Sequence, residues 1–203
     1  RLAGSGDLPL APFTESSRDS LLLPLSQPLE QYFDLLAECG ERQAQQELHL
    51  QAGPLLIEDW LTDLRGASAN PQRLVLHTGR LKDRLDKVTR EWALHLAACA
   101  AGHPLTTHLQ GQDGRLTLPP LGRDAARENL DRIGHAWHQA LCEPLPIACA
   151  TAFAWLKGEE KDNGEYEARK AFESGFMHTG EQEKEPALAR AWADFDALLA
   201  PRH

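Results

Sequence analysis

The sequence predicts an α/β protein with a small mixed sheet flanked by helices, and three observations support this prediction. Polar and apolar residues alternate with a period of two over residues 47–51, which indicates a β-strand. Helical spacing of apolar residues then extends over residues 80–102. Two further short strand-like segments follow, at residues 106–110 and 115–118. Strands that alternate with long helices are typical of α/β architectures.

The composition is that of an ordinary globular protein. Of the 203 residues, 42% are hydrophobic and 25% are charged. The formal net charge is −9 and the sequence has no run of basic residues. Because phosphate contacts need clustered Lys and Arg, this balance argues against autonomous binding to nucleic acid. No stretch approaches the ~20 apolar residues that span a bilayer, so we expect no membrane partner.

The cysteine pattern predicts the cellular location of the chain, and its first residue bears on whether it is part of a longer protein. The four cysteines form no C-x-x-C pair, and most of their neighbours are small or apolar: Cys39, Cys99, Cys142 and Cys149. This pattern predicts reduced, mostly buried thiols and a cytoplasmic location. The chain begins at Arg1, so we expect it to be a piece of a longer protein.

The first part of the chain predicts a linker followed by one domain. Residues 1–28 are rich in Gly, Ser and Pro, which is typical of a segment that leads into a domain. Residues 29–203 are then expected to form a single domain. A short helix is expected over residues 29–39, because Leu29 and Phe33 share helical spacing, and Gly40 ends it.

The middle of the chain predicts strands, a long helix and a hairpin. Residues 47–51, 55–64 and 73–78 are expected to form an antiparallel meander, because only short turns separate them. The helix expected over residues 80–102 places apolar residues three or four positions apart. The pair Asp113–Gly114 predicts a hairpin between the two strands that follow.

The last third predicts helices joined by polar loops. The expected helices cover residues 124–141, 152–156, 166–173 and 187–199. The first of them has an apolar side formed by Leu130, Ile133, Trp137 and Leu141. Residues 159–165 and 180–186 are expected to be polar loops.

Sequence motifs for metal, phosphate or acyl chemistry are weak. The chain contains no GxxxxGK[ST], GxGxxG, GxSxG or HExxH pattern. His135 and His138 lie three residues apart on an expected helix, but no third ligand is evident nearby. His95, His103 and His108 are close in sequence, yet a helix and a strand would point them apart. We therefore expect no metal site and no cofactor.

A metal-dependent nuclease of the PD-(D/E)xK type would need an Asp on one strand and (D/E)-x-K on the next. The carboxylates of such a site hold Mg²⁺, and the Lys orients water or stabilises charge. The second predicted strand carries Glu58, Asp59 and Asp63. The third strand, residues 73–79, has neither a carboxylate nor a Lys. The (D/E)-x-K pattern occurs only at residues 159–161, in a polar loop, where we interpret it as a chance match.

Four stretches, in order, carry a resemblance to a known family. They are GDLPLAPF at residues 6–13, W-x-x-H-L-x-x-C-A-x-G at 92–102, LTLPPL at 116–121, and the segment 144–157 that ends in AWLK. Together they resemble the C-terminal domain of RecC, the gamma chain of bacterial exodeoxyribonuclease V (the RecBCD complex). Each motif alone is weak, and their order makes the set more specific.

The resemblance implies a degenerate PD-(D/E)xK nuclease-like fold whose catalytic residues are lost. When the chain is laid over the active relatives, the first acid position falls on Thr62, with Asp59 and Asp63 nearby. The second catalytic strand falls on Leu76 to Thr78, and neither residue suits the chemistry. The degenerate positions are thus Thr62, Leu76 and Thr78, and no catalytic residue is expected.

The role that the resemblance implies is a non-catalytic scaffold in the helicase–nuclease that processes DNA double-strand breaks for recombinational repair. The implied partners are the RecB and RecD subunits, and DNA in the intact complex. One expected docking surface is the closing helix, through exposed parts of Trp192, Phe195 and Leu199. The other is the polar loop at residues 159–165.

Two alternatives belong to other functional classes. One is an active nuclease with a displaced site, which would combine Glu58, Asp59 or Asp63 with Lys82 or Lys87 of the next helix. The other is a protein-binding domain unrelated to DNA.

Overall fold

The computed structural model describes residues 14–82 and 84–200, and there the chain is a mixed α/β protein with small sheets flanked by helices. Backbone contacts divide it into two compact units. Unit 1 contains the described residues of Arg1–Leu50, Leu56–Asp83 and Leu94–Glu128. Unit 2 contains those of Gln51–Leu55, Arg84–Ala93 and Asn129–His203.

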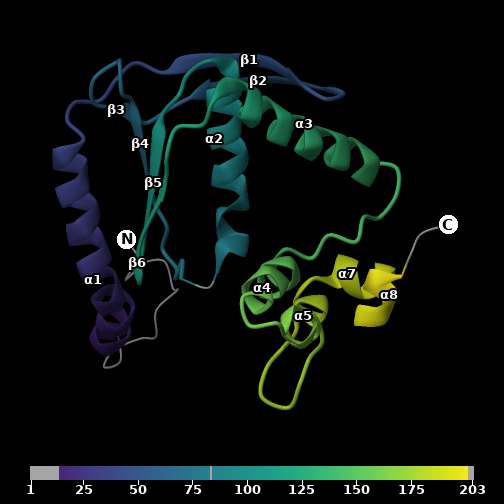
Figure 1. Ribbon diagram of the computed structural model, residues 1–203. Helices are drawn as coiled ribbons and strands as arrows, with labels where there is room; N and C mark the ends of the chain where they lie inside the picture. Colours follow the sequence, from purple (N-terminus) through teal and green to yellow (C-terminus); the bar gives the residue numbers. More distant parts are fainter. Residues whose placement is uncertain (1–13, 83, 201–203) are drawn as a thin grey trace. The chain divides into compact units, whose positions relative to one another are not determined.

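The main sheet of unit 1 has four strands in the spatial order β3 (Leu64–Arg65), β4 (Gln72–Leu76), β5 (Thr106–Gly111) and β6 (Gly114–Leu118). The β3–β4 and β5–β6 pairs are antiparallel, and β4 and β5 are parallel with Gln72 opposite Thr106. Parallel neighbours need a long crossover, and α2 (Thr89–Ala101) lies on this connection. Figure 1 shows α1 and α2 on opposite sides of the sheet. The hairpin expected at Asp113–Gly114 is confirmed.

The first two strands form a separate two-stranded sheet, β1 (Gln46–Ala52) and β2 (Leu55–Leu61), joined at Gly53 and Pro54. The alternation predicted for β1 is confirmed by its alternating burial. The expected three-stranded meander is wrong. Strand β2 ends at Leu61, the backbone turns at Asp63 (φ 60°), and β3 and β4 belong to the other sheet.

Helix α1 (Thr14–Glu38) is much longer than the helix expected over residues 29–39. It runs through the segment expected to be a linker, whose first 13 residues lie outside the described part. Leu35 of the helix and Cys39, which directly follows its last residue, are buried, while Phe33 is largely exposed. The helix stops before Gly40, whose φ of 77° is the left-handed conformation that commonly ends helices.

The long helix expected over residues 80–102 begins later than predicted. A 3₁₀ turn (Leu85–Val88) precedes α2, and residues 95 to 100 of α2 are all buried. The backbone N–H groups of Leu81 and Lys82 donate to the Asp113 carboxylate instead of entering a helix. A distant side chain therefore overrides the local helical spacing.

Unit 2 is helical, with most of α3 (Arg123–Ala140) followed by α4 (Cys149–Glu159), α5 (Gly164–Phe172), α6 (Glu181–Lys184), α7 (Pro186–Ala191) and α8 (Phe195–Leu199). Helix α6 occupies part of the loop expected at residues 180–186. The single closing helix expected over residues 187–199 is wrong. The chain is extended at Trp192 and Asp194, and the Asp194 carboxylate accepts from the Ala197 N–H at 2.7 Å to begin α8.

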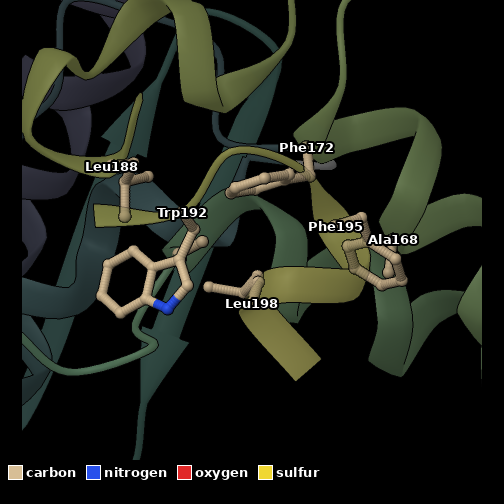
Figure 2. Close-up of a cluster of buried hydrophobic side chains, with 7 residues drawn as sticks. Ala168, Phe172, Leu188, Trp192, Phe195 and Leu198 are labelled. Carbon is tan, nitrogen blue, oxygen red and sulfur yellow. The ribbon is translucent and has the colours of Figure 1, made fainter. Parts of the chain in front are cut away.

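A compact apolar core holds these short helices together (Figure 2). Its buried members are Ala148, Ala168, Phe172, Leu188, Trp192, Phe195 and Leu198. The rings of Phe172 and Phe195 have centroids 6.1 Å apart, and the Arg169 guanidinium lies 4.8 Å from the Phe195 ring centre. Every residue of this cluster belongs to unit 2.

The structure bears on two predictions from the sequence, the burial of the cysteine thiols and the lack of a membrane-spanning segment. All four cysteines are free; Cys39 and Cys99 are buried as expected, whereas Cys142 is exposed because the chain leaves α3 just before it. No helix in the described ranges is both long and apolar enough to cross a bilayer.

Candidate functional site

The sequence resemblance aligns three residues with lost nuclease positions, and two of them lie at the carboxyl end of β4 in unit 1. Leu76 is the last residue of β4, and Thr78 follows it in the chain. Thr62 lies in the short connection between the end of β2 and the start of β3, next to Asp63, whose φ is 60°.

The side chains at these positions offer little to a divalent cation. Leu76 carries no ligand atom. Thr78 is exposed, and its carbonyl accepts from Gln112 Nε2 at 2.7 Å. The Thr62 hydroxyl donates to Asp63 Oδ2 at 3.4 Å. A neutral hydroxyl lacks the negative charge by which carboxylates hold Mg²⁺.

Each carboxylate on and after β2 has its own separate partner. Glu58 lies 3.2 Å from the His49 ring, and both side chains are exposed. Asp59 accepts from the neighbouring Trp60 N–H at 2.7 Å. Asp63 forms an exposed ion pair with Arg42 at 3.0 Å. The three acids that the displaced-site alternative requires are thus engaged with three different groups.

Of the two lysines of that alternative, Lys87 pairs its ammonium with a carboxylate outside β2, and Lys82 is held through its backbone. The Lys82 N–H donates to Asp113, and the Lys87 ammonium lies 3.5 Å from the Asp86 carboxylate, within unit 2. The Asp113 carboxylate accepts hydrogen bonds from the backbone N–H of Leu81 at 2.7 Å, from that of Lys82 at 3.1 Å and from Arg80 Nε at 3.3 Å. These donors, the Leu81 N–H foremost, lower the pKa of the Asp113 carboxyl. The only sequence feature that pointed to this group of donors around the Asp113 carboxylate was the Asp–Gly turn.

The histidines considered as ligands are occupied in different ways. His95 is buried, and its Nε2–H donates to the Pro119 carbonyl while Nδ1 accepts from the Thr107 hydroxyl, both at 3.0 Å. Burial lowers the pKa of His95 and favours this neutral form. His135 Nδ1 donates to the Asp131 carbonyl at 2.8 Å. Among residues 14–82 and 84–200, no group of three or more His, Cys, Asp or Glu side chains is placed to hold a metal ion.

A hydrogen-bonded chain of polar side chains crosses the sheet of unit 1, which the sequence did not indicate. Gln72 Oε1 accepts from the Cys39 thiol and from His108 Nε2, each at 3.1 Å. His108 Nδ1 accepts from the Thr117 hydroxyl at 3.1 Å. Burial raises the pKa of Cys39 and lowers that of His108, so both are held neutral. These contacts tie α1 to the sheet and leave neither group activated.

The structure places the expected docking residues mostly inside the protein. Phe195 has no exposed surface and Trp192 is a buried member of the same core of unit 2, so neither forms a docking surface in this structure (Figure 2). Leu199 is 49% exposed. The polar segment at residues 159–165 forms the turn between α4 and α5, and Asp162 has φ 56° there.

Other apolar side chains are exposed instead. Ile133, Trp137 and Leu141, expected on the buried side of α3, are each more than a third exposed. Phe176 and Met177, between α5 and α6, are the two most exposed large apolar residues of the described part. Their only sequence sign was an apolar pair inside a polar, glycine-flanked segment.

Comparison with known families gives one match. The model of the RecC C-terminal domain matches residues 1–160 of the 203-residue chain. The resemblance seen in the sequence is thereby confirmed. A search of the curated proteins found no match.

Proposed function

Because the chain belongs to the RecC C-terminal domain family, we propose that it is a non-catalytic docking domain of the RecBCD helicase–nuclease, which acts in DNA repair and recombination. In this role the domain contacts the RecB or RecD subunit within the complex that acts on DNA. It retains a nuclease-like arrangement of sheet and helices without the chemistry of a nuclease.

The observation that carries the non-catalytic part of this proposal is the set of side chains at the end of β4. Hydrolysis by this class of enzyme needs two carboxylates that converge on a metal, with a Lys beside them. The resemblance aligns Leu76 with the second acid, Thr78 with the Lys and Thr62 with the first acid. The nearby Asp63 is paired with Arg42, which supports a structural role for that carboxylate.

The exposed apolar side of α3 supports the docking part of the proposal. Ile133 and Trp137 lie four residues apart on one side of α3, and the exposed Leu141 directly follows its last residue. Exposed apolar residues that gather in this way commonly mark protein interfaces. An acidic protein with net charge −9 is also better suited to contact protein subunits than to hold DNA by itself.

Co-purification tests this proposal. We expect the tagged chain, expressed together with RecB and RecD, to retain at least one of the two subunits through gel filtration. Trp137→Ser should lower the retained fraction, while Tyr166→Ser, at another exposed aromatic residue of unit 2, should not. If the intact chain retains neither subunit, the docking proposal fails.

A further inference from the structure

The segment between α5 and α6 forms a built turn with two apolar side chains at its tip. Gly175 and His178 face each other as an antiparallel bridge, with N–H to carbonyl distances of 2.9 and 3.4 Å. Phe176 and Met177 occupy the two positions between them. Phe176 is fully exposed and Met177 is 89% exposed. In Figure 1 the chain between α5 and α7 extends away from the other helices of this unit.

Several contacts fix the base of this turn. His178 Nε2 donates to the carbonyls of Lys170 and Glu173 at 2.8 and 3.2 Å, which fastens the turn to the end of α5. The Ser174 hydroxyl accepts from the Gly180 N–H at 2.9 Å and donates to the Glu183 carboxylate.

Packing leaves little freedom at the two glycines of the turn. A Cβ on Gly175 would lie 2.5 Å from the His178 ring, and one on Gly180 would lie 2.2 Å from the Phe172 carbonyl oxygen. Only glycine therefore fits at these positions without a shift of the chain. The two apolar side chains are presented from an ordered base, so binding through them would cost little ordering of the backbone.

The charges around the turn narrow the choice of partner. Residues 173–185 contain four Glu and one Lys. Such a segment repels the phosphates of nucleic acid and of anionic lipid. A second copy of this chain would carry the same net charge of −9, which also opposes self-association through this surface. A pocket bordered by Lys or Arg complements both features, since the apolar tip fills it and the exposed Glu185 side chain meets its rim.

We propose that the turn at residues 175–178 is an anchor that inserts Phe176 and Met177 into an apolar, basic-rimmed pocket of a partner protein subunit. This inference rests on the proposed docking function and adds a second contact to the one proposed for α3. It lies beyond residue 160, where the family match ends.

Binding of the 203-residue chain to purified RecB and RecD, measured by biolayer interferometry, tests the anchor. The double variant Phe176→Ser/Met177→Ser should weaken binding by at least about tenfold, because anchor residues carry most of the energy of an interface. Phe176→Leu/Met177→Leu, which keeps the apolar surface, should stay within about threefold of the parent chain. Tyr166→Ser is the control for loss of an exposed aromatic side chain elsewhere in unit 2.

A charge reversal at Glu185 tests the contribution of the acidic side chain. Glu185→Lys should weaken binding, and the effect should shrink as salt rises, because exposed charges are screened. Circular dichroism and thermal unfolding of each variant show that the fold is retained, which is expected because both tip side chains point into solvent.

The outcomes separate the anchor from the wider proposal. If the parent chain binds neither subunit, the docking function and the anchor are both overturned. If it binds and the serine double variant binds equally well, the anchor alone is overturned. Loss of self-association or of DNA binding in that variant, with subunit binding intact, would also overturn it, since the occupant would then be a second copy or nucleic acid.

Discussion

At the scale of single residues, His95 links pH to stability. Its ring joins the Thr107 hydroxyl to the Pro119 carbonyl, and burial holds its pKa below the ordinary value. In the unfolded chain the ring titrates near ~6.5. As the pH falls below about 6.5, the unfolded chain takes up a proton that the folded chain resists, so the free energy of unfolding should decrease. The loss should level off below the lowered pKa.

Urea unfolding at about pH 7.5 and about pH 5.5 measures this effect. His95→Gln should cost about 1–3 kcal/mol at the higher pH, because the Thr107 hydroxyl loses its partner. The same variant should show a smaller loss between the two pH values than the parent chain. Burial also lowers the pKa of His108, so that residue contributes a slope of the same sign in both proteins. Equal losses in the parent and the variant would show that His95 is not a source of the pH dependence.

At the scale of elements, one carboxylate holds two helices of unit 2 together. Glu181, in the first turn of α6, accepts from the N–H groups of Ala150 and Thr151 at 3.0 and 2.7 Å, and from the Thr151 hydroxyl at 2.8 Å. It thereby caps the N-terminus of α4, where a negative charge is favourable. Glu181→Ala should lower the free energy of unfolding by about 1–3 kcal/mol, since it leaves these donors unsatisfied.

Chemical denaturation of matched variants tests whether the Glu181 carboxylate stabilises the protein through its hydrogen bonds to α4. Glu185→Ala, in the same segment but with an exposed side chain that makes no cap, should change stability by less than about 0.5 kcal/mol. Glu181→Gln should fall between the two, because it keeps an acceptor but loses the charge. A Glu181→Ala protein as stable as the Glu185→Ala protein would contradict the role assigned to this contact.

Local patterns predicted those elements whose hydrogen bonds are local. The β5–β6 hairpin follows from alternation around the Asp113–Gly114 turn, and α3 follows from apolar spacing. The expected helix start at residue 80 failed because Asp113, 32 residues away from Leu81, takes the N–H groups that a helix would use. The closing helix failed because the Asp194 side chain bonds to the Ala197 N–H and restarts the helix there.

The candidate site was predictable only in part, for the same reason. The residue types at Thr62, Leu76 and Thr78 were available from the sequence, whereas the separate partners of Glu58 and Asp63 depend on contacts with His49 and Arg42. The spacing on α3 indicated a buried apolar side, and the structure leaves most of it exposed. Periodicity identifies an apolar face, but it does not tell whether the chain itself or a partner covers that face.

At the scale of the whole molecule, Phe195→Ala tests whether the chain loses structure as one domain or separately in its two units. The Phe195 ring is fully buried in the core of unit 2, so its loss should cost about 3–5 kcal/mol. Hydrogen exchange should then show weaker protection of amides in α4 and α5. The sequence-based prediction of one domain over residues 29–203 requires an equal loss of protection in β5 of unit 1. A loss confined to unit 2 would contradict that prediction, and an unchanged α5 would contradict the assigned core.

The central claim for the whole molecule is that this member of the RecC C-terminal domain family does not cleave DNA. The most direct measurement incubates the purified 203-residue chain with linear double-stranded and single-stranded DNA, in the presence of Mg²⁺ or Mn²⁺, and follows the release of fragments. We expect no cleavage above that of the buffer with either metal. Cleavage that requires the metal and disappears in Asp59→Ala or Asp63→Ala would contradict the claim and establish an active, displaced nuclease site.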